Sequence, residues 1–152
     1  MIRPQHNHQL NDLYRLLEGE IGYTGKLLDT LNRETEILVA RDIPALESCT
    51  AEKLEWITRL KSTAEQREAL LTVLDGEPLK TDDQAAALWQ DLMSLAASCR
   101  ERNHINGSII ETGYRQSQQA LDILQGTPRK AELYDHAGHT TRSGKSSTLA
   151  RA

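Results

Sequence analysis

The sequence predicts an all-α fold: an elongated antiparallel three-helix hairpin or bundle with coiled-coil-like seams, followed by a flexible basic C-terminal tail. Aromatic residues make up 4% of the chain and Phe is absent, so the apolar content is mostly Leu and Ala, which favour helices over strands. Turn and capping residues also divide the 152 residues into three long segments with short connections. We therefore expect one helical domain over residues 1–126 and a tail over residues 127–152.

The first segment, about residues 6–40, repeats leucine at helical spacing. One heptad line holds Leu10, Leu17, Leu31 and Leu38, with Leu13, Tyr14, Ile21, Leu27 and Leu28 beside it. Gly19, Gly22 and Gly25 interrupt this segment, and each costs a helix up to about 1 kcal/mol relative to alanine. We expect these glycines to mark a close approach of a neighbouring helix rather than a ligand site.

The second segment, about residues 43–75, begins with a strong capping signal. Asp42 can serve as the N-cap, and Pro44 lies in the first turn, where its missing N–H removes no helical hydrogen bond. The apolar stripe that follows consists of Leu46, Cys49, Leu54, Trp56, Ile57, Leu60, Ala64, Leu71 and Leu74.

The third segment, about residues 82–125, follows a turn at residues 75–78. Thr81 and Gln84 form a capping-box pattern at its start, and Gly126 is predicted as the C′ residue at its end. A helix of this length extends on the order of 65 Å. Its stripe consists of Ala85, Leu88, Leu92, Leu95, Cys99, Asn106, Ile109, Gly113, Ala120, Ile123 and Leu124.

Polar residues interrupt these stripes. Lys53 and Arg67 share a heptad line with leucines, and Asn106 lies at the middle of the third segment. Polar seam residues can fix the register of a bundle, or they can mark a groove left open for a partner's helix. Several carboxylates are expected on outer, solvated faces instead, namely Glu34, Glu36, Glu47, Glu52 and Glu55.

Charge separates the body from the tail. Residues 1–125 carry 13 Lys/Arg and 20 Asp/Glu, whereas residues 126–152 carry 5 and 2. The acidic body argues against nucleic acid as a partner, because phosphate binding needs a basic face. The tail has too few apolar residues to fold alone, and Leu133 and Tyr134 are its main apolar anchor, with the composition of a short linear motif.

The residues suggest no catalytic chemistry. Cys49 and Cys99 form no CxxC pair and are predicted to be small core residues in a reducing compartment. Gly144-Lys145-Ser146 lacks the spacing and the leading strand of a phosphate-binding loop, and no histidine pattern is typical of a metal site. With neither a signal peptide nor a long apolar run, we expect a cytoplasmic, non-enzymatic protein without cofactor, metal or membrane insertion, which binds other proteins.

Four short motifs, taken in order, resemble the FlgN family of flagellar export chaperones. They are Glu52-Lys53 before a Leu-rich run, Leu88-Trp89-Gln90, Asn103-His104-Ile105-Asn106-Gly107, and Leu133-Tyr134 followed by Gly138. The resemblance extends along most of the chain and implies a cytoplasmic helical chaperone without catalytic activity.

The resemblance also implies partners. Family members bind the C-terminal amphipathic ends of hook–filament junction proteins, prevent their premature association and deliver them to the cytoplasmic domain of the export gate. It implies a client-binding or helix-packing role for Trp89, Asn103, Asn106 and Gly107, and gate docking by Leu133 and Tyr134. A non-catalytic helical scaffold or signalling bundle is the alternative, and self-association through exposed apolar stripes stays open.

Overall fold

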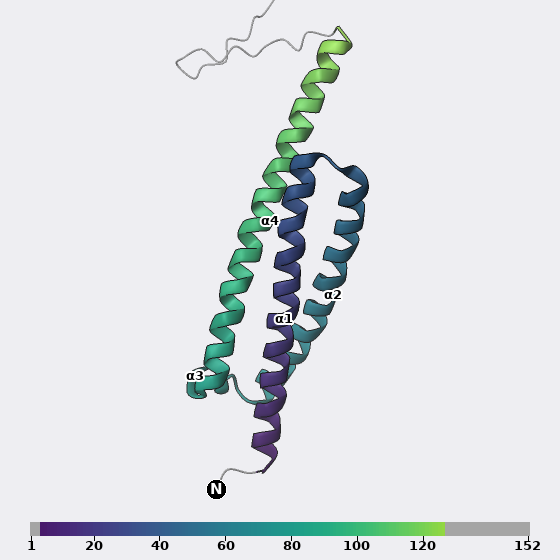
Figure 1. Cartoon of the computed structure of the whole chain (residues 1–152). Coiled ribbons are helices and arrows are strands. Elements are labelled where there is room, and N and C mark those ends of the chain that lie inside the picture. The colour runs from purple at the N-terminus through teal and green to yellow at the C-terminus, as the bar shows by residue number, and fades with distance from the viewer. Residues whose placement is uncertain (1–3, 127–152) are drawn as a thin grey trace, which may run out of the picture. The chain divides into compact units, whose positions relative to one another are not determined.

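The computed structural model describes residues 4–126 and is helical along three long segments (Figure 1). Helix α1 spans Pro4–Ala40, α2 spans Ile43–Val73, α3 spans Pro78–Thr81 and α4 spans Asp83–Leu124. These described residues contain no strand, and the all-α prediction is confirmed. The chain divides into two units, the first ending at Thr112 and the second beginning at Gly113, within α4.

Helix α1 lies between α2 and α4 in the first unit (Figure 1). Ion pairs join α1 to α2 at several levels, and two of them involve buried side chains, Glu20 with Arg67 and Glu34 with Lys53. The residue numbers rise along one helix as they fall along the other, so α1 and α2 are antiparallel. A two-residue connection between the helices allows only this arrangement.

Helices α1 and α4 run in the same direction. The Cys99 thiol donates to the Thr24 carbonyl at 3.5 Å, and Asn106 Nδ2 donates to the Leu31 carbonyl at 3.0 Å. Both numbers rise together, so α1 and α4 run parallel, as expected for the first and third helices of an up-down-up bundle.

The apolar core lies where α1 and α4 begin to pack against each other. Leu13, Leu17, Ala85 and Leu92 are buried there and form one cluster. Partly buried side chains surround this cluster, namely Tyr14, Ile21, Leu70, Leu71, Leu79, Leu88, Trp89 and Met93. Residues from α2 and from the α2–α4 connection thus contribute to the same core.

Polar side chains occupy much of the remaining interior. Among residues 4–126, six buried residues are polar or charged, against seven hydrophobic ones, so polar pairing must contribute to the packing of the bundle. On α1 most buried positions repeat every three, four or seven residues and include both kinds, namely Leu13, Leu17, Glu20, Thr24, Leu31 and Glu34, and Thr30 is buried beside Leu31.

One expectation about surface charge is wrong. Glu34 was expected on an outer face, yet it is 2% exposed, because it continues the buried line of α1 and finds partners on two other helices. Glu52 is only partly exposed and accepts a hydrogen bond from Arg33 at 2.6 Å. Glu36, Glu47 and Glu55 are exposed as expected.

The start of α2 and the end of α4 agree with the prediction, whereas the start of α4 differs from it. Asp42 caps α2, and its Oδ1 accepts from the Ala45 amide at 3.2 Å. Gly126 follows α4 with φ of 65°, the left-handed conformation expected of a C′ glycine.

The cap of α4 is Asp82 rather than Thr81. Asp82 Oδ1 accepts the Ala85 amide at 2.8 Å, whereas the Thr81 hydroxyl donates back to the Glu77 carbonyl at 2.9 Å. The reason is that Pro78–Thr81 forms the short helix α3 where the sequence predicted only a turn, and Thr81 belongs to that helix.

Two other groups of residues depart from the expected packing. A Cβ atom added at Gly22 or Gly25 would meet nothing within 4 Å, so only Gly19, 3.8 Å from Thr63 Cγ2, has a nearby neighbour. The expected close approach at the other two glycines is therefore wrong. Five residues assigned to the buried stripes are exposed instead, namely Leu54, Ile57, Ala120, Ile123 and Leu124.

Among residues 4–126, no helix combines the length and the apolar content that crossing a bilayer would require.

Candidate functional site

Trp89 participates in helix packing. Its side chain is partly buried against the apolar core, and the Arg67 guanidinium carbon lies 4.8 Å from its ring centroid. Arg67 Nε in turn donates to Glu20 Oε2 at 2.7 Å. One side chain from each long helix therefore joins in a single buried contact, which combines an ion pair with a cation–π interaction.

Asn106 forms a second junction of all three helices. It is 1% exposed, and its Nδ2 donates to the Leu31 carbonyl and to Glu34 Oε2 at 3.0 and 2.7 Å. The Thr35 hydroxyl donates to its Oδ1 at 2.6 Å. Glu34 Oε1 also accepts from Lys53 Nζ at 2.6 Å. The amide thus has partners for both its donor and acceptor atoms, and this seam position is closed rather than left open for another molecule.

The other residues of the Asn-x-x-Asn-Gly motif face outward. Asn103 and Gly107 are exposed, and a Cβ atom added at Gly107 would meet nothing within 4 Å. Tight packing within this chain therefore does not explain the glycine. Ile110 follows at helical spacing and is 52% exposed. We call Asn103, Gly107 and Ile110 the α4 stripe, since residues four and three apart lie on one side of a helix.

Leu133, Tyr134 and Gly138 lie outside the residues that the structure describes.

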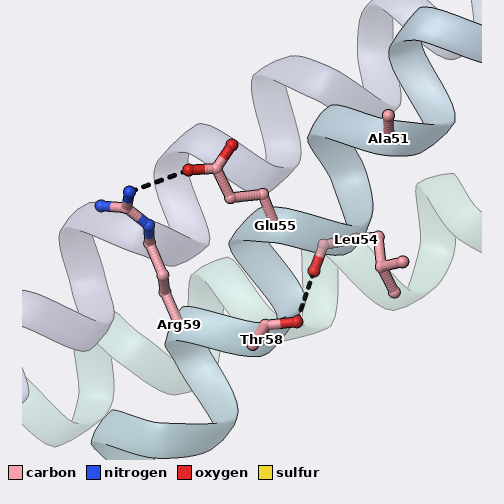
Figure 2. Close-up of a pocket in the computed structure, with 5 residues that line it drawn as sticks. All are labelled: Ala51, Leu54, Glu55, Thr58 and Arg59. Carbon is pink, nitrogen blue, oxygen red and sulfur yellow. Dashed lines mark hydrogen bonds and ion pairs between the residues drawn. The ribbon is translucent and has the colours of Figure 1, made fainter.

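A shallow depression of about 410 Å³ lies on α2, open to solvent and lined by Ala51, Leu54, Glu55, Thr58 and Arg59 (Figure 2). Leu54 is 63% exposed, while Glu55 and Arg59 pair with each other at 2.8 Å. The Thr58 hydroxyl donates to the Leu54 carbonyl at 2.9 Å. The polar groups of Thr58, Glu55 and Arg59 are thus engaged locally, and the depression offers an apolar contact rather than a reactive group.

Exposed apolar side chains also lie on the end of α4, in the second unit. Tyr114 is 65% exposed, Leu121 47% and Leu124 82%. With Ser117 between them these residues follow a 3-4-3 spacing, so all four lie on one side of the helix, which we call the distal face. The sequence analysis missed this surface because it assigned the end of α4 to the buried stripe. The apolar spacing continues along the helix, so it does not reveal where the side chains become exposed.

Neither cysteine is placed for nucleophilic chemistry. Cys49 and Cys99 are buried free thiols, as predicted, and each donates to a main-chain carbonyl of α1 at 3.5 Å. Burial raises the pKa of both thiols, which keeps them protonated. In the part of the chain that the structure describes, no three His, Cys, Asp or Glu residues are arranged to hold a metal ion.

Arg33 and Glu52 form an ion pair on the α1–α2 edge. Arg33 Nη2 lies 2.6 Å from Glu52 Oε1, and this hydrogen bond is the main cause that lowers the pKa of Glu52 and raises the pKa of Arg33. Trp56 Nε1 also donates to Glu52, at 3.4 Å. The Glu52-Lys53 motif therefore contacts Thr30, Arg33 and Glu34 of α1 and has a helix-pairing role.

Comparison with known proteins identifies the family of the chain. The family model described as FlgN protein matches residues 1–142. No curated protein and no solved structure matches the chain. Since the match covers nearly the whole sequence, including the three long helices, the chain belongs to the FlgN family of flagellar export chaperones.

Proposed function

We propose that this protein is a cytoplasmic chaperone that binds the C-terminal amphipathic ends of hook–filament junction proteins, prevents their premature association and delivers them to the export gate. Membership of the FlgN family over residues 1–142 is the observation that carries this proposal. The physical requirement is a surface that accepts a helix with one apolar side, and long helices with exposed apolar side chains meet that requirement.

We assign the client contact to the α4 stripe. Gly107 has open space around it, so its bare backbone forms a flat point that a second helix can approach closely. Ile110 is 52% exposed and offers apolar area, and the exposed Asn103 amide can both donate and accept a hydrogen bond. This assignment separates the motif into a client-binding part and a packing part, because Asn106 is fully engaged within the bundle.

Trp89 is assigned to packing rather than to the client. Its ring is covered by Arg67 and by the apolar core, so a client would have to displace a buried ion pair to reach it. Breaking a buried pair is costly, on the order of 3–5 kcal/mol, which disfavours this route.

Leu133 and Tyr134 remain the candidates for docking at the export gate. The proposal rests on the match of this pair to the tail motif of the FlgN family, and an apolar pair within a largely polar tail suits such a contact. Tyr134→Ala should weaken binding to the cytoplasmic domain of the gate and leave client binding mostly intact. If the unaltered chain and Tyr134→Ala bind the gate domain with equal affinity in a direct binding assay, Tyr134 has no role in docking.

Isothermal titration of the full chain with peptides from the C-terminal segments of junction proteins tests the client contact. Gly107→Leu adds a bulky side chain where a client helix would approach, and overpacking of about 1–3 kcal/mol predicts an affinity loss of roughly 5- to 150-fold. Gly22→Leu is the matched control, because Gly22 is also an exposed helical glycine with no atom near its added Cβ.

The titration also separates the alternatives. Equal loss in both variants would indicate a general effect on the bundle and would remove the α4 stripe as the contact. Absence of binding by the unaltered chain would contradict the chaperone function itself and favour a helical scaffold with a different partner.

A further inference from the structure

We propose that a basic edge between α1 and α2 binds an acidic amphipathic helix of another protein. The basic edge consists of Arg15, Tyr23, Lys26 and Arg33 on α1 and of Trp56 and Arg59 on α2. It lies in the first unit and shares no residue with the α4 stripe, so this inference does not depend on the proposed function.

All lysines and arginines of α1 lie on one line of the helix. Arg15, Lys26 and Arg33 are separated by eleven and seven residues, which correspond to about three and two helical turns. All three residues are exposed. The body of the chain is acidic, with 13 Lys/Arg against 20 Asp/Glu over residues 1–125, so this line is a local concentration of positive charge.

The line borders α2 rather than α4. Gly19 lies on the same line, and a Cβ atom added there would be 3.8 Å from Thr63 Cγ2 of α2. Arg33 Nη2 lies 2.6 Å from Glu52 Oε1, also on α2. The contacts of α1 with α4 use other positions, such as Thr24. Since α1 lies between α2 and α4, the fourth helix leaves the basic edge uncovered (Figure 1).

Two aromatic rings lie at the centre of the edge. The ring centroids of Tyr23 and Trp56 are 6.1 Å apart, and the Arg59 guanidinium carbon is 5.4 Å from the Trp56 ring centroid. Tyr, Trp and Arg are enriched in the hot spots of protein interfaces, where the rings offer large contact area at a low entropy cost. Gly22 precedes Tyr23 and has no atom within 4 Å of an added Cβ, so a second helix can approach the α1 backbone closely.

Charge identifies the occupant. Arg33 and Arg59 pair with glutamates of α2, whereas Arg15 and Lys26 form no ion pair within residues 4–126. A partner that supplies carboxylates at two levels about 16 Å apart along the axis would complement these two cations. The tail of this chain has the wrong sign for that role, since residues 126–152 carry 5 Lys/Arg and 2 Asp/Glu.

The surrounding carboxylates determine where the partner lies and what it is. An exposed carboxylate follows each basic residue of the line three positions later, namely Glu18, Asp29 and Glu36. These lie about 60° around α1 from the line, on the side away from Tyr23, and repel an acidic helix toward α2. Glu52 and Glu55 on α2 disfavour nucleic acid, which is charged along its whole length, whereas a helix can carry its carboxylates on one side only.

Fluorescence anisotropy of a labelled acidic peptide, titrated with the full chain, tests the binding. The probe is a helix of about four heptads with leucine at positions a and d and glutamate at e and g, and its companion has lysine in place of glutamate. The acidic peptide should bind with a dissociation constant of roughly 1–100 μM at low salt, and the lysine peptide at least about tenfold more weakly. Added salt should weaken binding of the acidic peptide.

Charge reversal at Lys26 tests the edge itself. Lys26→Glu replaces attraction by repulsion and should weaken binding of the acidic peptide by roughly 3- to 30-fold, while Lys26→Arg should retain it. Lys61→Glu is the matched control, because it makes the same change of charge at an exposed position of α2. Residue 61 is two positions from Arg59 and therefore does not face the edge, so its affinity should equal that of the unaltered chain.

Two glycine variants separate the edge from the proposed client contact. Gly22→Leu adds a bulky side chain where the acidic helix approaches and should weaken its binding by at least about fivefold. Gly107→Leu should leave that binding unchanged. The opposite pattern is expected with peptides from junction proteins.

Several results would overturn the proposal. Equal affinities of Lys26→Glu and the unaltered chain exclude the basic edge, and equal losses in Lys26→Glu and Lys61→Glu indicate an effect of net charge alone. Equal binding of the acidic and lysine peptides contradicts selection by charge. An oligonucleotide that binds more tightly than the acidic peptide, and that Lys26→Glu releases, would be the ligand instead. If the full chain doubles in mass and Lys26→Glu abolishes the doubling, a second copy occupies the edge. Loss of the acidic peptide in Gly107→Leu but not in Gly22→Leu places it on the α4 stripe and leaves the chaperone function standing.

Discussion

The junction at Glu34 allows a quantitative test of how polar pairs hold this bundle together. Glu34→Ala removes a carboxylate whose side chain is 3% exposed and which accepts hydrogen bonds from Lys53 and Asn106 at 2.6 and 2.7 Å. The substitution leaves a buried amide without one partner and a partly buried ammonium without its counter-charge.

The expected cost follows from burial. Breaking a fully buried pair costs about 3–5 kcal/mol, but the Lys53 side chain is 23% exposed and can turn partly toward water. We therefore expect a loss of about 2–3 kcal/mol in the free energy of unfolding, equivalent to roughly 4–12 °C in Tm for a chain of this length. Against a typical total of about 5–15 kcal/mol, this is a large fraction.

Urea denaturation followed by circular dichroism at 222 nm measures the loss. Glu55→Ala is the matched control, because Glu55 also forms an ion pair, with Arg59, but both side chains are more than half exposed. Its cost should stay within about 0.5 kcal/mol. A Glu34→Ala cost no larger than that of Glu55→Ala would refute the view that the buried junction stabilises the packing of the three helices.

Three further predictions concern other parts of the first unit. Burial and then the hydrogen bond to Asp82 raise the pKa of Tyr14, so its contribution to stability is complete below pH 10 and is lost as the pH rises through the folded-state pKa. Tyr14→Phe should reduce the loss of stability at alkaline pH, relative to the unaltered chain, in denaturation curves recorded from pH 8 to 11. Cys49 and Cys99, with raised pKa values and buried sulfurs, should react with a thiol reagent at pH 8 only at the rate of unfolding, and immediate reaction in the native protein would contradict this. Gly22→Ala should stabilise the protein by about 0.5–1 kcal/mol in thermal melts, since the added methyl meets no atom and favours the helix; a lower Tm would show a contact at that position.

The sequence predicted the helices well because their signals are local. The cap at Asp42 and the C′ glycine at Gly126 depend only on neighbouring residues, and both are confirmed. Thr81 does not cap α4 because its hydroxyl donates to the Glu77 carbonyl within α3. Asp82 is the next residue and can also cap a helix, so the sequence alone does not reveal which of the two is the N-cap.

The partners of the polar seam residues were less predictable. Lys53 and Arg67 were recognised as interruptions of a heptad line, but pairing them with Glu34 and Glu20 requires the register between α1 and α2. A signal was available, since Glu20 and Glu34 continue the spacing of Leu13 on the buried line of α1. The spacing of one helix reveals that a charged residue interrupts its apolar stripe, but it does not reveal which residue of the other helix carries the opposite charge.

The sequence did not reveal which residues of the candidate site are accessible. Motif resemblance pointed to Trp89, Asn103, Asn106 and Gly107 together, whereas the structure turns Asn103 and Gly107 outward and uses Trp89 and Asn106 in packing. A motif along one helix necessarily faces several directions, and only the positions of the neighbouring helices decide which residues stay accessible.

The central position of α1 has a consequence for how the chain acquires its structure during synthesis. Its contacts with α2 need only the two-residue connection at residues 41–42 to close, while its contacts with α4 join residues more than sixty positions apart, such as Leu31 and Asn106. The α1–α2 hairpin can therefore form on the ribosome before α4 emerges, with Glu34 already paired to Lys53. Before α4 packs, Glu34 Oε2 lacks the hydrogen bond from Asn106 while Glu34 Oε1 can already accept from Lys53. We therefore expect α4 to pack last, against a surface that α1 and α2 already form. Pulsed hydrogen exchange should accordingly protect the amides of α1 and α2 before those of α4, and simultaneous protection would show that the three helices fold as one unit.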